Sequence, residues 1–65
     1  MKISLKAARV NAGMELKDVA KELNVNYTTV ARWESGESRL SAGALLALCR
    51  LYEVSPDDIK DEFEI

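Results

Sequence analysis

The four residues Leu23-Asn-Val-Asn26 place the tightest constraint on the fold of this chain, because they separate two helical segments. Before this link, apolar residues recur with the i, i+3, i+4, i+7 spacing of a core-facing helix, at Leu16, Val19, Ala20 and Leu23. After the link, Val30 and Trp33 fall on one side of a second predicted helix. So short a link forces the two helices to cross sharply. The turn needs a residue that tolerates positive φ, and Asn24 is of that kind.

The residues around the turn are suited to such a crossing. Ala20 stands where the two helices would approach most closely, and a larger side chain there would push them apart. Val30 is β-branched and Trp33 is bulky and apolar, so both suit the inner side of the second helix. Together with the tight turn, these residues predict a helix-turn-helix over residues 16–35.

Three further helices are predicted from their caps. Ser4 begins a first helix over 5–12 that ends at Gly13, Ser41 begins a fourth, and Ser55-Pro-Asp-Asp58 begins a fifth. The helix that follows the link, which is the third along the chain, has Asn26 as its N-cap and Gly36 to close it. Four of the starts have the apolar pair of a hydrophobic staple: Met14/Val19, Val25/Val30, Leu40/Leu45 and Val54/Ile59. We therefore expect one compact all-α domain of five helices over residues 1–65, with the strongly apolar fourth helix at its centre.

The outward side of the third helix is unusually bare. Thr28, Ala31, Arg32 and Ser35 lie on it, so it carries one long cation and otherwise short side chains. Charge is also segregated along the chain: residues 1–52 hold eight basic and five acidic residues, whereas residues 53–65 hold six acidic residues and Lys60. The net charge of −2 therefore does not exclude a polyanion partner, provided that the acidic segment 53–65 points away from it.

Nothing in the sequence indicates an enzyme, a metal site or a cofactor. The chain has no histidine, and its single cysteine, Cys49, stands in the apolar run ALLALCRLY, where a small buried hydrophobe is expected. No apolar run approaches the roughly 20 residues that span a bilayer, and the N-terminus lacks a secretion signal. We expect a soluble cytoplasmic protein, with no membrane contact and no small-molecule ligand.

From about Leu5 to Ile59, the sequence resembles the phage-repressor-like helix-turn-helix family, also called XRE or Cro/C1-type. The resemblance is carried by R..AGM, DVAKELNV, TTVARWESG and LLALCRLYEVSPDDI. It implies a compact lambda-repressor-like fold, with the third helix in the major groove of double-stranded DNA and the second across the phosphate backbone. It also implies a sequence-specific transcriptional regulator, most simply a repressor that binds a palindromic operator as a homodimer.

By position, the resemblance also implies residue roles. The base contacts fall on Tyr27, Thr28, Ala31 and Arg32. The DNA backbone contacts fall on Lys17, Asn26, Ser35 and Arg39. Arg32 can pair bidentately with guanine, and Thr28 and Ala31 can offer methyl contact to thymine. Tyr27 is large and marginal, so a phosphate or sugar contact suits it better.

At the start of the second helix the chain departs from the family. Glu15 and Leu16 stand where members commonly have Ser or Thr and then Gln, which dock on a phosphate. Glutamate would face a polyanion there, and Leu16 is explained as the first residue of the apolar stripe. The departure slightly favours a second hypothesis, that the chain is a protein-interaction module such as an anti-repressor or antitoxin-like partner.

Three further expectations come from similar proteins. Arg9 and Glu34 would form a structural ion pair between the first and third helices. The termini, MKISL and EFEI, would pair as short antiparallel strands, with a disordered tail as an equally open alternative. The homodimer interface would lie at the edge of the fourth and fifth helices and on the tail, at Tyr52, Ile59, Phe63 and Ile65.

Overall fold

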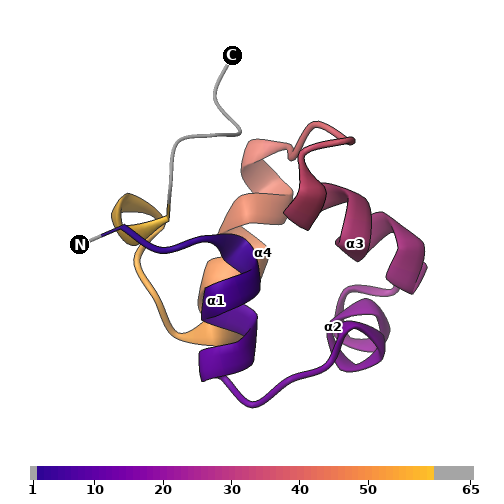
Figure 1. Ribbon diagram of the computed structural model, residues 1–65, viewed down its shortest axis with the longest axis horizontal. Helices are drawn as coiled ribbons and strands as arrows, with labels where there is room; N and C mark the ends of the chain where they lie inside the picture. The colour runs from indigo at the N-terminus through magenta and orange to yellow at the C-terminus, as the bar shows by residue number, and fades with distance from the viewer. Residues whose placement is uncertain (1, 60–65) are drawn as a thin grey trace.

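The computed structural model describes residues 2–59, which form four α-helices and one short 3₁₀ helix (Figure 1). The elements are α1 (Leu5–Asn11), α2 (Leu16–Leu23), α3 (Tyr27–Ser35), α4 (Ala42–Tyr52) and the 3₁₀ helix η1 (Pro56–Asp58). The all-α character is confirmed, and α2 and α3 stand where the sequence predicts the helix-turn-helix.

Serine side chains cap two of the four α-helices as predicted, and at the start of η1 Ser55 Oγ accepts the amide of Asp57 at 3.2 Å. Ser4 Oγ accepts the amide of Ala7 at 3.0 Å, and Ser41 Oγ accepts the amide of Ala44 at 3.1 Å. The expected side-chain cap from Asn26 is wrong. The amide of Thr29 donates instead to the backbone carbonyl of Asn26 at 3.0 Å, so this amide, one of the two that such a cap serves, already has an acceptor.

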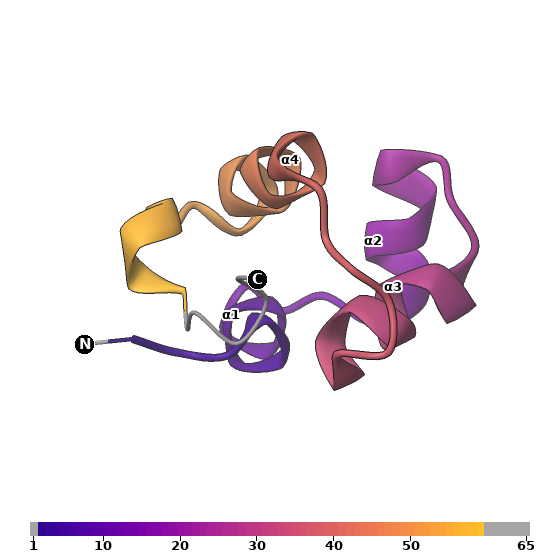
Figure 2. The ribbon, with the colours of Figure 1, turned by 90° about the horizontal axis from the view of Figure 1, so that it is seen from above.

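The turn between α2 and α3 has the predicted left-handed residue. Asn24 has φ 57° and ψ 48°, and the amide of Val25 closes the end of α2 on the carbonyl of Ala20 at 2.9 Å. Ala20 is buried, as the close approach of the two helices requires. Figure 2 shows the resulting sharp crossing of α2 and α3.

A substitution at Asn24 tests this turn. Asn24→Val is expected to lower the free energy of unfolding by about 1–2 kcal/mol, because a β-branched side chain is strained at positive φ. Asn24→Gly is the matched control and should preserve or raise stability, since glycine adopts this conformation freely. Urea denaturation of the three proteins gives the comparison. Equal stability of the valine and glycine variants would show that the turn does not need the left-handed conformation.

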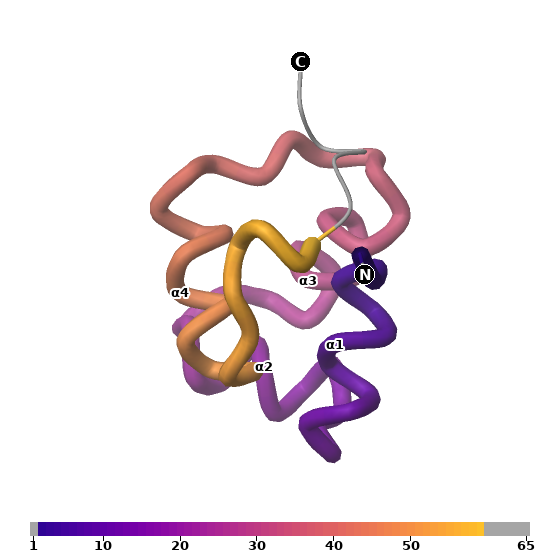
Figure 3. The backbone as a smooth tube through the Cα atoms, turned by 90° about the vertical axis from the view of Figure 1, so that its left-hand side faces the viewer, coloured from indigo at the N-terminus to yellow at the C-terminus, as the bar shows by residue number. Residues whose placement is uncertain are grey.

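The core lies between the α1–α4 pair and the helix-turn-helix. Figure 3 shows α1 and α4 on either side of η1, with α2 and α3 behind them. The largest fully buried side chains come from all four helices: Leu5, Val19, Val30 and Leu48. α4 is buried on one face only, because Leu46 is 49% exposed. Cys49 is buried, as predicted, and burial raises the pKa of its thiol.

The C-terminal part of the described chain departs from the prediction. In place of a fifth α-helix there is a single 3₁₀ turn, after which Ile59 is extended (φ −93°, ψ 137°). The amide of Ile3 donates to the carbonyl of Asp58 at 2.8 Å, and Ile3 and Ile59 form an isolated parallel bridge. This pairing and the burial of Ile59 hold the backbone out of a helix. The predicted antiparallel strands are not confirmed, and residues 1 and 62–65 lie outside the described residues.

Candidate nucleic-acid interface

The outer face of α3 presents the side chains that the sequence assigns to base contacts. Tyr27 is 62% exposed, Thr28 and Arg32 are exposed, and Ala31 is partly exposed. Val30, on the opposite face of the helix, is fully buried. α3 ends at Gly36, whose φ of 82° is the predicted left-handed conformation. A helix of this kind offers a protruding arginine on a surface otherwise lined by short side chains, with Tyr27 at its first position.

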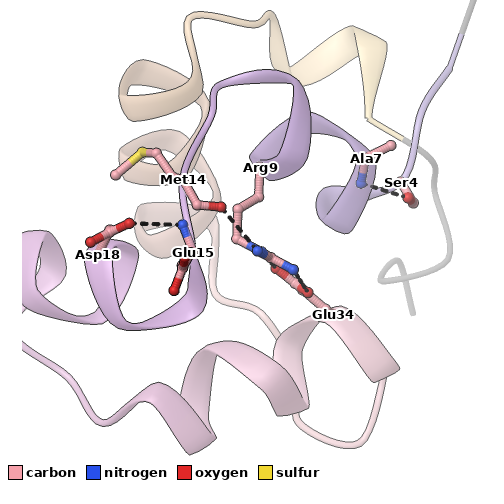
Figure 4. A network of polar contacts seen from close by, with 7 residues as sticks. All are labelled: Ser4, Ala7, Arg9, Met14, Glu15, Asp18 and Glu34. Carbon is pink, nitrogen blue, oxygen red and sulfur yellow. Dashed lines mark hydrogen bonds and ion pairs between the residues drawn. The ribbon is translucent and has the colours of Figure 1, made fainter.

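The first turn of α2 carries charges of both signs. The amide of Glu15 donates to Asp18 Oδ2 at 2.9 Å, which anchors the start of the helix (Figure 4). Lys17 Nζ lies 3.9 Å from Glu15 Oε1, and both side chains are highly exposed. The cation that would approach a phosphate is therefore beside a carboxylate, and solvent screens their attraction.

The four residues assigned to the DNA backbone are all exposed but do not form one cluster. Asn26 and Ser35 stand at opposite ends of α3, about 13 Å apart along a helix that rises 1.5 Å per residue. Ser35 Oγ donates to the carbonyl of Arg32 at 3.2 Å and accepts the amide of Glu37 at 3.4 Å. Its hydroxyl thus already helps to end α3.

The fold adds a cation that sequence reasoning missed. Lys6 of α1 shares a shallow hollow with Leu16 of α2 and with Ala31 and Ser35 of α3. Because Lys6 lies 25 residues before Ala31, no local pattern in the sequence could place it beside α3. Leu16 also lines a second hollow with Lys17 and Tyr27, so it forms part of the surface between α2 and α3 as well as packing against the core.

An ion pair between Arg9 and Glu34 joins α1 to α3, as Figure 4 shows. Arg9 Nε donates to Glu34 Oε2 at 2.7 Å and its Nη2 donates to Oε1 at 3.3 Å. Nη1 donates to the carbonyl of Met14 at 3.0 Å, so the same guanidinium also holds the loop before α2. The two side chains are only 11% and 10% exposed. The pair therefore fixes the position of α3 relative to α1.

The pKa values of Arg9 and of Tyr52 are both raised. The hydrogen bond to Glu34 raises the pKa of Arg9, so the guanidinium stays positively charged. Burial, with a smaller contribution from Glu34, raises the pKa of Tyr52 to about 12. The phenol of Tyr52 is consequently neutral at ordinary pH.

The predicted dimer surface is corrected by the structure. Tyr52 is 5% exposed and Ile59 is 2% exposed, so both belong to the core of the monomer and have little surface to offer a partner. The sequence shows that these residues are apolar but not which of them the fold covers. Phe63 and Ile65 lie outside the described residues.

Neither a metal cluster nor a membrane span is present in residues 2–59. Among these residues, no group of three or more His, Cys, Asp or Glu side chains could hold a metal ion. No helix in the same range is long and apolar enough to cross a membrane.

The helix-turn-helix family matches the chain over residues 5–59. No curated protein and no solved structure gave a match.

Proposed function

This chain belongs to the phage-repressor-like (XRE, Cro/C1-type) helix-turn-helix family and is a DNA-binding regulator, and we propose that it is a sequence-specific repressor. The proposal is that it binds a palindromic operator as a homodimer, in the cytoplasm. One observation carries it: the exposed face of α3 has a single long cation among short side chains, on a helix that an ion pair holds in place. Such a face allows the backbone of α3 to approach base edges closely.

Base reading is assigned to the exposed face of α3. The guanidinium of Arg32 can donate two hydrogen bonds to guanine O6 and N7. Thr28 and Ala31 would contact thymine methyl groups on the groove floor. Tyr27, at the first position of α3, would reach sugar or phosphate.

Backbone contacts are assigned to residues around this face. Lys17, Asn26, Ser35 and Arg39 are exposed, and Lys6 joins them because it lies beside the C-terminal half of α3. Contacts of this kind set the register of the protein on the duplex and carry no direct sequence information. They also make binding depend on salt, because each neutralised phosphate releases counterions.

Substitution of Arg32 tests the base-reading role. Arg32→Ala is expected to cost about 1–3 kcal/mol of binding free energy and to relax the preference at one base pair in each half-site. Arg39→Ala or Lys17→Ala should instead weaken all sequences alike and reduce the salt slope. The measurement is a salt series of binding to a selected operator and to its point mutants.

The same series includes a control variant, and one of its possible results would contradict the base-reading role of α3. Lys21→Ala removes an exposed cation from the last turn of α2, to which no DNA contact is assigned, and should leave both affinity and sequence preference unchanged. If Arg32→Ala and Thr28→Ala bind every site as the parent does, α3 is not the reader.

A second candidate function is a protein-interaction module, and the first turn of α2 favours it. Glu15 is exposed beside Lys17, and Leu16 takes part in the surface between α2 and α3. An exposed carboxylate opposes docking on a phosphate, whereas an apolar side chain suits a protein partner. Binding to random duplex DNA separates the two functions. A DNA-binding repressor should bind it and weaken steeply with salt, whereas a protein-only module should show no binding.

A further inference from the structure

The first turn of α2 carries more negative than positive charge, and it adjoins the face assigned to base contacts. Glu15 and Asp18 are acidic and Lys17 is basic, so two acids and one base give residues 15–18 a net charge of −1. Glu15 also lines a hollow together with Tyr27, the first residue of α3. A duplex whose sugar-phosphate backbone touches Tyr27 therefore lies beside the carboxylate of Glu15.

The acidic side chains of this turn already occupy the positive end of α2. The amide of Glu15 donates to Asp18 Oδ2 at 2.9 Å, and Figure 4 shows the two residues together at the start of the helix. The N-terminus of a helix attracts anions through its free amides and its dipole. Here carboxylates of the chain itself balance part of that charge, so less of it is left to attract a phosphate.

The cations near Glu15 do not cancel its charge towards DNA. Lys17 Nζ is 3.9 Å from Glu15 Oε1, but the two side chains are 77% and 76% exposed, so water weakens this pair. Arg9 lines the same hollow, yet its guanidinium is already matched by Glu34, whose Oε2 lies 2.7 Å from Arg9 Nε. The carboxylate of Glu15 therefore keeps part of its charge uncompensated.

We propose that Glu15 is a repulsive charge that limits the affinity of this protein for DNA. Its carboxylate opposes the approach of a phosphate to the first turn of α2, and it competes with that phosphate for Lys17. The inference rests on the proposed function and adds the element that sets how tightly the proposed interface holds DNA. Because phosphates carry no direct sequence information, the repulsion weakens binding to the operator and to random duplex DNA by the same factor.

The test measures binding of Glu15→Gln to a selected operator and to random duplex DNA across a salt series. The substitution removes the charge at nearly constant size and leaves in place the hydrogen bond from the backbone amide to Asp18. At about 0.1 M salt both duplexes should bind about five- to tenfold more tightly, since a repulsion at close range is removed. The salt slope should become steeper by up to about one, because one more phosphate can be neutralised. The ratio of the two affinities should stay the same.

A second substitution tests the competition for Lys17. Lys17→Met should weaken binding by a further factor of about two to three when it is made in the Glu15→Gln background instead of in the parent, which is the usual strength of an exposed ion pair. The reason is that the lysine is then free to pair with a phosphate. Equal losses in the two backgrounds would overturn the competition for Lys17.

Two further variants are matched controls. Glu22→Gln makes the same change at an exposed residue in the last turn of α2, which lines a hollow with Arg50 of α4, and it should alter affinity less than about twofold. Glu15→Asp keeps a carboxylate at the same position and should bind within about threefold of the parent. Because aspartate is a good N-cap, a gain in affinity that came from a more stable α2 would appear in this variant.

The outcomes separate this proposal from the proposed function. The proposal is overturned if Glu15→Gln leaves affinity unchanged or lowers it, or if Glu15→Asp gives the same gain. It is also overturned if the gain is confined to particular sequences, which would make Glu15 a base contact. In each of these cases the parent still binds duplex DNA with a steep salt dependence, so the proposed function stands. If neither the parent nor Glu15→Gln binds duplex DNA at low salt, both are overturned.

Discussion

Arg9→Met is expected to lower the free energy of unfolding by about 3 kcal/mol, because it leaves the carboxylate of Glu34 largely buried without its partner. The loss also removes the donor to the carbonyl of Met14, so the loop before α2 loses its link to α1. Glu34→Gln should be destabilising in the same direction, since an amide cannot balance the guanidinium charge. Urea denaturation followed by circular dichroism gives both values.

A double-substitution cycle separates the ion pair from simple loss of packing. Arg9→Met with Glu34→Leu should cost less than the sum of the two single changes, because neither charge then remains unpaired in the core. Arg32→Met is the control, since it removes an exposed arginine from the same helix that bears Glu34. If Arg9→Met and Glu34→Gln each leave the melting temperature unchanged, the pair is not structural.

Leu48→Ala is expected to lower the free energy of unfolding by about 2–5 kcal/mol, through lost burial and the cavity left behind. Leu48 is 1% exposed and is among the largest fully buried side chains of the protein. Domains are typically stable by only about 5–15 kcal/mol, so a chain this small would be close to unfolding at room temperature. Chemical denaturation at low protein concentration, below any self-association, gives the value.

Leu46→Ala is the matched control for this change. It removes the same atoms from the same helix two positions away, at a site that is 49% exposed. Its cost should stay below about 1 kcal/mol, since little apolar area is returned to water. Equal losses for the two leucines would show that α4 does not bury the face that contains Leu48.

The sequence by itself determined the local structure. The apolar stripe of α2, the serine caps at Ser4 and Ser41 and the left-handed residues Asn24 and Gly36 all follow from residue type and spacing. These features depend on neighbours within one or two helical turns. Such neighbours are only a few positions apart in the chain, so their interactions can be predicted from the sequence. For the same reason, helical periodicity alone identifies the bare outer face of α3.

Only the tertiary structure decided which apolar residues are covered and which distant residues meet. Tyr52 and Ile59 are surface candidates by sequence, yet the packing of α4 and the bridge to Ile3 bury both. The same bridge ends η1 after one turn, although its capping serine, proline and acids predict a longer helix. Lys6 reaches the side of α3 only because α1 packs there. Burial and long-range pairing depend on how whole helices are placed against one another, and helical periodicity specifies the face of each helix but not its partner.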